Sequence, residues 1–184
     1  MTNRAILPAL VLCLALPLTA SAQEEDVPVS PFRTRGGVSL GIAPGSPNAY
    51  GIGAVAEPSF AIVDQFRLGL RAEGLALVGL DLGSSQSVFA SLHVLVATLG
   101  KLEFDFTTGD VRPFVGLGAG SYTVVILSGG TGGAGALAGT GFGVMPQIGL
   151  NLGGFRIAAQ YHAILTGPGS TANAASLELT GRFL

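Results

Sequence analysis

The residues of this chain that could do chemistry are a sparse set of charged and imidazole side chains. Only 11% of the 184 residues are Asp, Glu, Lys or Arg, against about 25% in an average protein. Several of them alternate with apolar residues along the chain. This set comprises Arg35, Glu57, Arg67, Arg71, Glu73, His93, Arg112, Arg156, His162, Glu178 and Arg182.

Arginine and carboxylate groups could form either buried ion pairs or a passage that attracts anions. The set holds six arginines and three glutamates, so the excess cations would need polar partners such as Gln147, Asn151 and Gln160. The two histidines lie on separate segments, and with scattered glutamates they form no defined ligand cluster for a metal. We therefore predict no catalytic residue, no metal site and no cofactor.

The alternation also indicates which elements must position these side chains. From Phe66 to Glu73, large apolar residues take one parity and charged residues take the other, and Leu177 to Phe183 repeat the rhythm. Side chains of opposite parity face opposite sides of a β-strand. Each of these strands is therefore expected to have one apolar face and one charged face.

Eight segments are long enough to cross a bilayer as strands, which takes about 9–11 residues. They are 33–43, 50–62, 66–78, 88–104, 111–125, 139–152, 155–165 and 175–184. Long connections rich in Gly, Pro or Ser (43–49, 79–87, 128–138 and 166–173) alternate strictly with tight links (63–65, 107–110 and 153–154). The pattern predicts an all-β fold, an eight-stranded antiparallel up-and-down transmembrane β-barrel.

The faces of this barrel follow from parity. Charged residues are expected inward, since a basic residue facing lipid near the midplane costs roughly 2–4 kcal/mol. The fifth segment is ambiguous, because Phe114 and Tyr122 share the parity of Arg112. A bulge, or aromatic rings packed into the lumen, would explain it. The expected lipid-facing residues are Leu68, Leu70, Val94, Val96, Leu177, Leu179 and Phe183.

The N-terminus indicates the compartment. A short basic start, an apolar run and Ala20-Ser21-Ala22 predict a cleaved signal peptide over 1–22, followed by an acidic periplasmic tail over 23–32 and the barrel over 33–184. The only cysteine lies in the predicted signal peptide, so thiol chemistry is not expected. A formal charge of −2 gives no support for nucleic-acid binding. Glycine-rich composition and the lack of an apolar run of about 20 residues argue against a spanning helix.

On these residues the chain resembles the small outer-membrane β-barrel proteins of the OmpA/OmpX-like superfamily, the "outer membrane protein beta-barrel domain" group. The resemblance covers nearly all of the mature chain. It rests on Glu57–Ile62 leading into Phe66–Arg71, on Arg112–Gly118, and on Phe142–Gly149 running on to Tyr161.

The resemblance implies a location and partners: the outer membrane, its lipid, and the barrel-assembly machinery. That machinery reads a terminal aromatic residue, a role that would fall to Phe183, although Leu184 follows it here. Barrel-borne lipid A deacylases are the enzymatic relatives, but their Ser-Asn after the histidine is missing, since Ala163-Ile164-Leu165 follow His162. Their catalytic groups also face lipid, whereas parity turns His162 inward.

Three classes of function remain open from the sequence. The first is a non-enzymatic barrel with a filled polar lumen, structural or interacting at the cell surface with a partner that the sequence does not identify. The second is a narrow, anion-leaning channel, which the arginine excess would suit. A lipid-modifying enzyme or a soluble lipocalin-like carrier is the third, and the apolar outward parity argues against the carrier.

Overall fold

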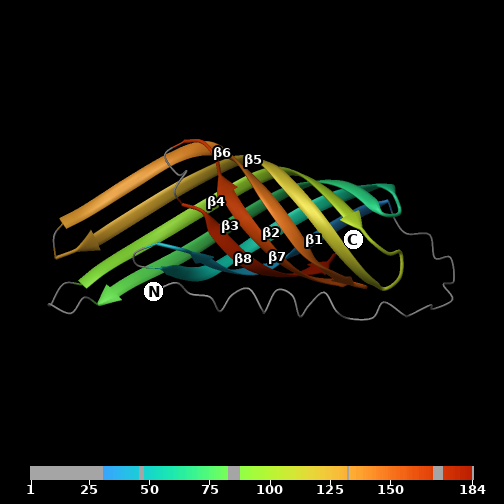
Figure 1. The fold of residues 1–184 in the computed structure, drawn as a ribbon, viewed down its shortest axis with the longest axis horizontal. Coiled ribbons are helices and arrows are strands. Elements are labelled where there is room, and N and C mark those ends of the chain that lie inside the picture. Colours follow the sequence, from blue (N-terminus) through green and yellow to red (C-terminus); the bar gives the residue numbers. More distant parts are fainter. Residues whose placement is uncertain (1–30, 46–47, 83–87, 132, 168–171, 184) are drawn as a thin grey trace, which may run out of the picture.

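The protein folds into a single closed β-barrel (Figure 1). The computed structural model describes residues 31–45, 48–82, 88–131, 133–167 and 172–183, and the predicted signal peptide and most of the acidic tail lie outside them. The strands are β1 (Phe32–Ala43), β2 (Ala49–Val63), β3 (Phe66–Leu82), β4 (Val88–Asp105), β5 (Val111–Gly130), β6 (Gly133–Leu152), β7 (Phe155–Ile164) and β8 (Ala174–Arg182).

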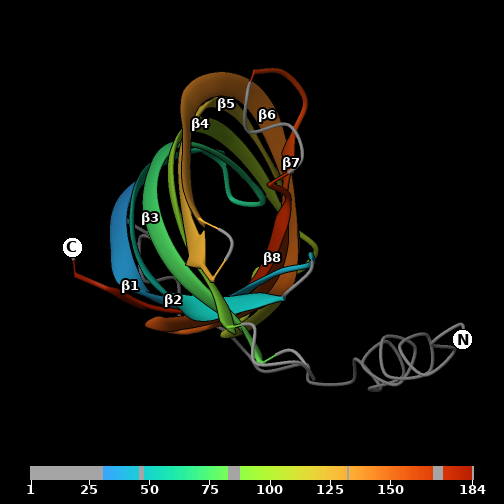
Figure 2. The ribbon, with the colours of Figure 1, turned by 90° about the vertical axis from the view of Figure 1, so that its left-hand side faces the viewer.

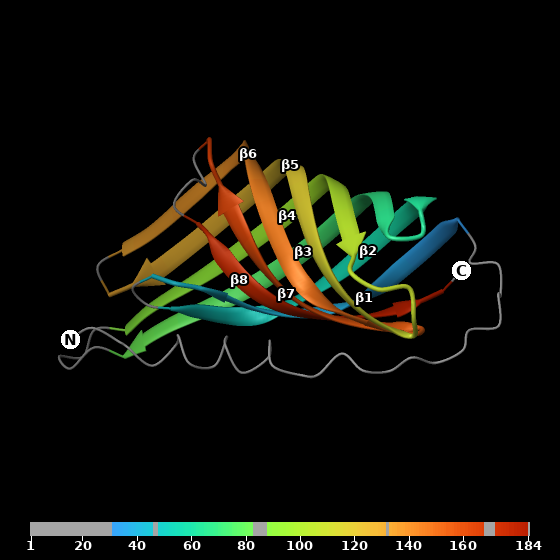
Figure 3. The same cartoon turned by 45° about the vertical axis from the view of Figure 1, so that its right-hand side comes forward.

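The eight strands are antiparallel and each pairs with its neighbours in chain order. The ring closes where β1 pairs with β8, with Val38 opposite Leu179, and the end view in Figure 2 shows the strands enclosing an interior. The strands are strongly inclined to the barrel axis (Figure 3), as closure of a sheet requires. The predicted fold class is therefore confirmed. Among the described residues, no helix is both long and apolar enough to span a membrane.

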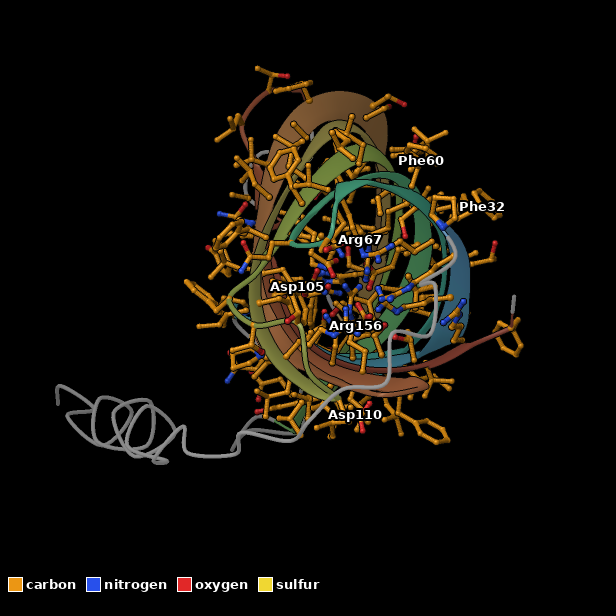
Figure 4. All side chains as sticks on the ribbon, turned by 90° about the vertical axis from the view of Figure 1, so that its right-hand side faces the viewer. Phe32, Phe60, Arg67, Asp105, Asp110 and Arg156 are labelled. Carbon is orange, nitrogen blue, oxygen red and sulfur yellow. The ribbon has the colours of Figure 1, made fainter. Side chains whose placement is uncertain are left out.

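The two faces of the wall follow the predicted parity. Outward apolar side chains are exposed, for example Leu70 (64%) and Phe183 (70%), while Arg67 and Arg71 are 1% exposed. Figure 4 shows Phe32 and Phe60 outside the ring, and Arg67 and Arg156 inside it. The other predicted lipid-facing residues lie on the outer surface too, with Leu68, Val96, Leu177 and Leu179 exposed and Val94 half-buried.

The fifth strand is regular, and packing explains why its two aromatic residues share the parity of Arg112. The ladders of β5 with β4 and β6 run without a register shift, and both Phe114 and Tyr122 are fully buried. Glycines on β6 make room for them, because a Cβ atom on Gly143 or Gly149 would lie 2.8 Å from the Tyr122 or Phe114 ring. Aromatic rings packed into the lumen are therefore the correct explanation.

One connection differs from the prediction. The segment 128–138 was expected to be a long loop, but β5 continues to Gly130 and β6 begins at Gly133, so the two form an extended hairpin. Glycine and alanine on both faces give no apolar–polar contrast, and the strand period is therefore invisible in the sequence. The strict alternation of long and short connections fails at this point. Similarly, Gly79 to Leu82 belong to β3 rather than to a loop.

The tight links sit together at one end of the barrel, which we call the turn side. They join β2 to β3, β4 to β5 and β6 to β7, and the last uses Gly153 in a left-handed conformation (φ 59°). The opposite end, with the connections after β1, β3, β5 and β7, is the loop side.

Candidate functional site

The interior on the turn side is filled by a network of ion pairs centred on Arg71 of β3. Its guanidinium group lies 2.7 Å from Glu73 Oε2, 2.7 Å from Glu178 Oε2 and 3.1 Å from Glu57 Oε2. Arg71 also donates to Gln160 Oε1 at 2.9 Å. All five side chains are at most 4% exposed. One cation thus meets carboxylates from three strands, β2, β3 and β8.

Glu57 of β2 is the matching anionic centre. It lies 2.8 Å from Lys101 Nζ and 2.7 Å from Arg156 Nη1, besides its contact with Arg71. Arg156 of β7 also pairs with Glu103, and its guanidinium carbon stacks 4.3 Å from the centroid of the Phe114 ring. Charge-assisted hydrogen bonds of this kind are stronger than those between neutral groups. The network therefore ties strands on opposite sides of the ring across the lumen.

The side-chain amides predicted to satisfy excess arginines supply part of this network. Gln160 Oε1 accepts from Arg71 at 2.9 Å and Asn151 Oδ1 accepts from Arg156 at 3.1 Å. Gln147 forms no hydrogen bond with an arginine of the described chain, but it donates to Gln160 Oε1 at 3.1 Å. The amides thus supply part of the hydrogen bonding that buried charges require.

Four further charged residues of the lumen were not predicted. Arg33, Lys101, Glu103 and Asp105 are each at most 5% exposed. Lys101, Glu103 and Asp105 continue the parity of His93 along β4, so counting in twos from His93 would have found them. Among the described residues, the buried charges are then Arg33, Arg35, Arg67, Arg71, Lys101 and Arg156 against Glu57, Glu73, Glu103, Asp105 and Glu178. Six cations face five anions, so the predicted arginine excess nearly disappears.

Three of the predicted lumen residues lie outside the buried network. Arg112 is half-buried at the turn side, where its Nε donates to Gly109 O at 2.6 Å. Arg182 ends β8 and is exposed. His93 is half-buried in the loop-side half, away from the ion pairs. Strand parity fixes the direction of a side chain but not its depth, and residues at strand ends reach the rim.

His162 lies at the loop-side boundary of the charged network. It is fully buried, with Nδ1 3.4 Å from the Tyr122 hydroxyl and Nε2 3.4 Å from Ser176 Oγ. The same Nε2 lies 3.7 Å from Glu73 Oε2. A nucleophile–His–carboxylate relay needs the nucleophile and the carboxylate on opposite ring nitrogens, so this group does not have the relay geometry.

On the loop side of His162 the interior is apolar. The largest buried side chains on the loop side include Leu75, Leu77, Leu95, Leu99 and Met145, all at most 2% exposed. They join Val124, Ile164 and several alanines in one hydrophobic cluster. We call this set the apolar layer, and the ion-paired set around Arg71 and Glu57 the charged layer. The two layers follow one another along the lumen, the charged layer toward the turn side and the apolar layer toward the loop side.

The described side chains offer no metal site. No group of three or more His, Cys, Asp or Glu residues among them is arranged to hold an ion. The carboxylates of the charged layer are instead bound by Arg71, Lys101 and Arg156.

Comparison with known proteins places the fold. No protein-family model and no curated protein sequence match the chain. Among solved structures it is similar to Neisserial surface protein A (NspA), with a TM-score of 0.51, 15% identity, and coverage of 83% of this chain and 96% of that chain. It is also similar to Ail, the attachment invasion locus protein of Yersinia pestis, solved with the heparin analogue sucrose octasulfate, with a TM-score of 0.50, 15% identity, and coverage of 83% and 97%. The chain therefore shares the closed β-barrel fold of these two proteins.

Proposed function

We propose that this protein is an integral outer-membrane β-barrel with a closed lumen, which serves as a structural or surface-interaction element and is neither a channel nor an enzyme. The observation that carries the proposal is the filling of the interior by two successive layers. Eight-stranded barrels have an interior just wide enough for side chains to fill. The exposed apolar exterior suits lipid, and closed barrels satisfy their backbone there.

Single-channel recording in planar bilayers tests the closed lumen. We expect no conductance from the reconstituted protein, nor from Arg71→Ala or Glu73→Ala, because the apolar layer stays in place in both variants. Steps of constant size from the parent would support the channel that the arginine excess suggested. Conductance confined to the variants would mean that the charged layer alone seals the barrel.

The membrane location has its own test. We expect the protein in the outer-membrane fraction, with a gel mobility that changes on boiling, because a folded barrel binds less detergent than its unfolded chain. Recovery as a soluble periplasmic protein would contradict the proposal. Phe183 is 70% exposed beside the end of β8, and we propose that it contributes to recognition by the assembly machinery. Phe183→Ala should then slow assembly without lowering the stability of the folded barrel.

The burial of His162 supports a non-enzymatic role. Its ring and Ser176 are at most 7% exposed and lie between the charged layer and the apolar layer, so a lipid substrate would have to displace one of the layers to reach this His–Ser pair. A lipid-modifying activity would predict loss of acyl-chain release on His162→Gln. We expect no acyl-chain release from the parent in the presence of outer-membrane lipid.

A further inference from the structure

Arg67 of β3 stands apart from the other buried charges. Its side chain is 1% exposed, yet Nε, Nη1 and Nη2 have no hydrogen-bond partner among the described residues. A buried guanidinium group has five N–H donors, and leaving such donors unpaired costs free energy. Four residues further along the same strand, Arg71 is bound by three carboxylates.

The two carboxylates whose charges act on Arg67 form no hydrogen bond with it. Glu103 lies opposite Arg67 in the β3–β4 ladder, but its Oε2 pairs with Arg156 and Lys101, and its Oε1 accepts from Asn151 at 3.3 Å. Asp105 Oδ1 accepts from Asn151 at 2.8 Å, and Oδ2 has no hydrogen-bond partner in the described chain. Asp105 acts on Arg67 through space only. One carboxylate therefore faces this end of the lumen without a direct bond to Arg67.

Other cations gather around Arg67 at the turn side. Arg33 is 5% exposed, and its Nε also lacks a partner among the described residues. The charges of Arg67, Arg35, Arg112 and Arg182 all act on Arg33. Arg112 is half-buried and Arg182 exposed, so the cluster extends from the interior to the rim. Figure 4 looks into this end and shows Arg67 and Asp105 inside the ring.

We propose that the turn-side mouth of the barrel is a binding site for a small oxyanion, a phosphate or carboxylate group, centred on Arg67 and flanked by Arg33 and Arg112. The planar guanidinium fork matches the geometry of both groups. The site is blind, because the charged and apolar layers close the lumen behind it, and it binds without conducting. That it opens to the periplasm rests on the proposed function; the binding itself does not.

Two sources could supply this chemistry. One is a free oxyanion from solution. The other is the chain itself, since Glu24, Glu25 and Asp26 precede β1 by only a few residues and β1 starts at this same mouth. Six residues reach at most about 20 Å when extended, enough to return to the rim.

Calorimetric titration of inorganic phosphate into the protein in detergent micelles at low ionic strength tests the site. We expect saturable binding by the parent, at least tenfold weaker binding by Arg67→Gln, and partial retention by Arg67→Lys. Asp105→Asn is the matched control on the same mouth, and it should bind severalfold more tightly because a repelling carboxylate is removed. A heat-dependent gel shift verifies that each variant is folded.

A variant with a neutralised tail, Glu24→Gln, Glu25→Gln and Asp26→Asn, distinguishes the two sources. Tighter phosphate binding by this variant would show that the tail occupies the site in the parent, whereas unchanged binding would identify solution oxyanion as the ligand. Absence of saturable binding in both parent and tail variant overturns the proposal. Equal affinities of the parent and folded Arg67→Gln would overturn it as well. These measurements do not depend on conductance, so they can disprove the anion site without disproving the closed lumen.

Discussion

The charged layer and the apolar layer fill the same tube by opposite means. Along β3 the inward parity runs through Arg71 and Glu73 and then, without a break, through Leu75 and Leu77. The charged layer excludes water by matching donors to acceptors, which demands complete pairing. The apolar layer excludes it by close packing, which demands matched volume. The comparison teaches that one strand can use both solutions within a few residues.

The largest difference between the layers should appear when a single charge is removed. Arg71→Met leaves three buried carboxylates without their shared cation, and we expect the free energy of unfolding to fall by about 3–5 kcal/mol. Urea unfolding in micelles, followed by tryptic protection or circular dichroism, measures it. Arg67→Met is the control: Arg67 forms no hydrogen bond with the described protein, so its replacement should leave the free energy of unfolding unchanged or raise it. Equal losses in both variants would refute the central role of Arg71.

In the apolar layer, stability should fall when a side chain is shortened and leaves a cavity. Leu99 is 1% exposed, and Leu99→Ala is expected to lower the free energy of unfolding by about 2–5 kcal/mol. Leu70→Ala on the outer face of β3 serves as control. Leu70 is 64% exposed, so its truncation leaves no internal cavity. The same urea titration compares them. A smaller effect for Leu99 than for Leu70 would mean that the loop-side interior is not a packed layer.

The smallest expected effect comes from comparing a hydroxyl group that binds the charged layer with one on the loop-side part of β4. Ser39 Oγ donates to Glu73 at 3.2 Å, so Ser39→Ala should cost about 1.5–3 kcal/mol, the range for hydrogen bonds to charged groups. Ser91 is 6% exposed and its Oγ has no hydrogen-bond partner in the described protein, so Ser91→Ala should be neutral or slightly stabilising. Unfolding curves of the two variants measure both effects. A larger loss of stability for Ser91→Ala than for Ser39→Ala would contradict the prediction.

The same contrast explains which parts of the molecule the sequence could predict. Where one face is charged, as from Phe66 to Glu73, parity reveals the strand, its direction and its register. Where both faces are apolar, as from Leu75 to Leu80, the inward and outward side chains look alike. The apolar layer was missed for this reason, and so was the extension of β5 and β6, whose glycines and alanines carry no contrast.

Within the charged layer, sequence reasoning could identify inward side chains but not their partners. Arg71 and Glu57 lie on strands paired with each other, yet Arg156 reaches Glu57 from across the ring. Which residues meet across a lumen depends on strand tilt and stagger, and no local pattern encodes them. The depth of Arg182 and Arg112 was missed for the same reason.

Inward and outward residues alternate along each strand of the wall with a period of two. A substitution alters one position, but deletion of a single residue within β3 would turn every later side chain of that strand to the opposite face. Arg71 or Glu73 would then lie on the outer surface, and leucines would face the carboxylates of the lumen. Such deletions should be far less tolerated than any point change. We therefore expect changes of length to be tolerated only in the connections between strands, where the chain can vary while the wall stays in register.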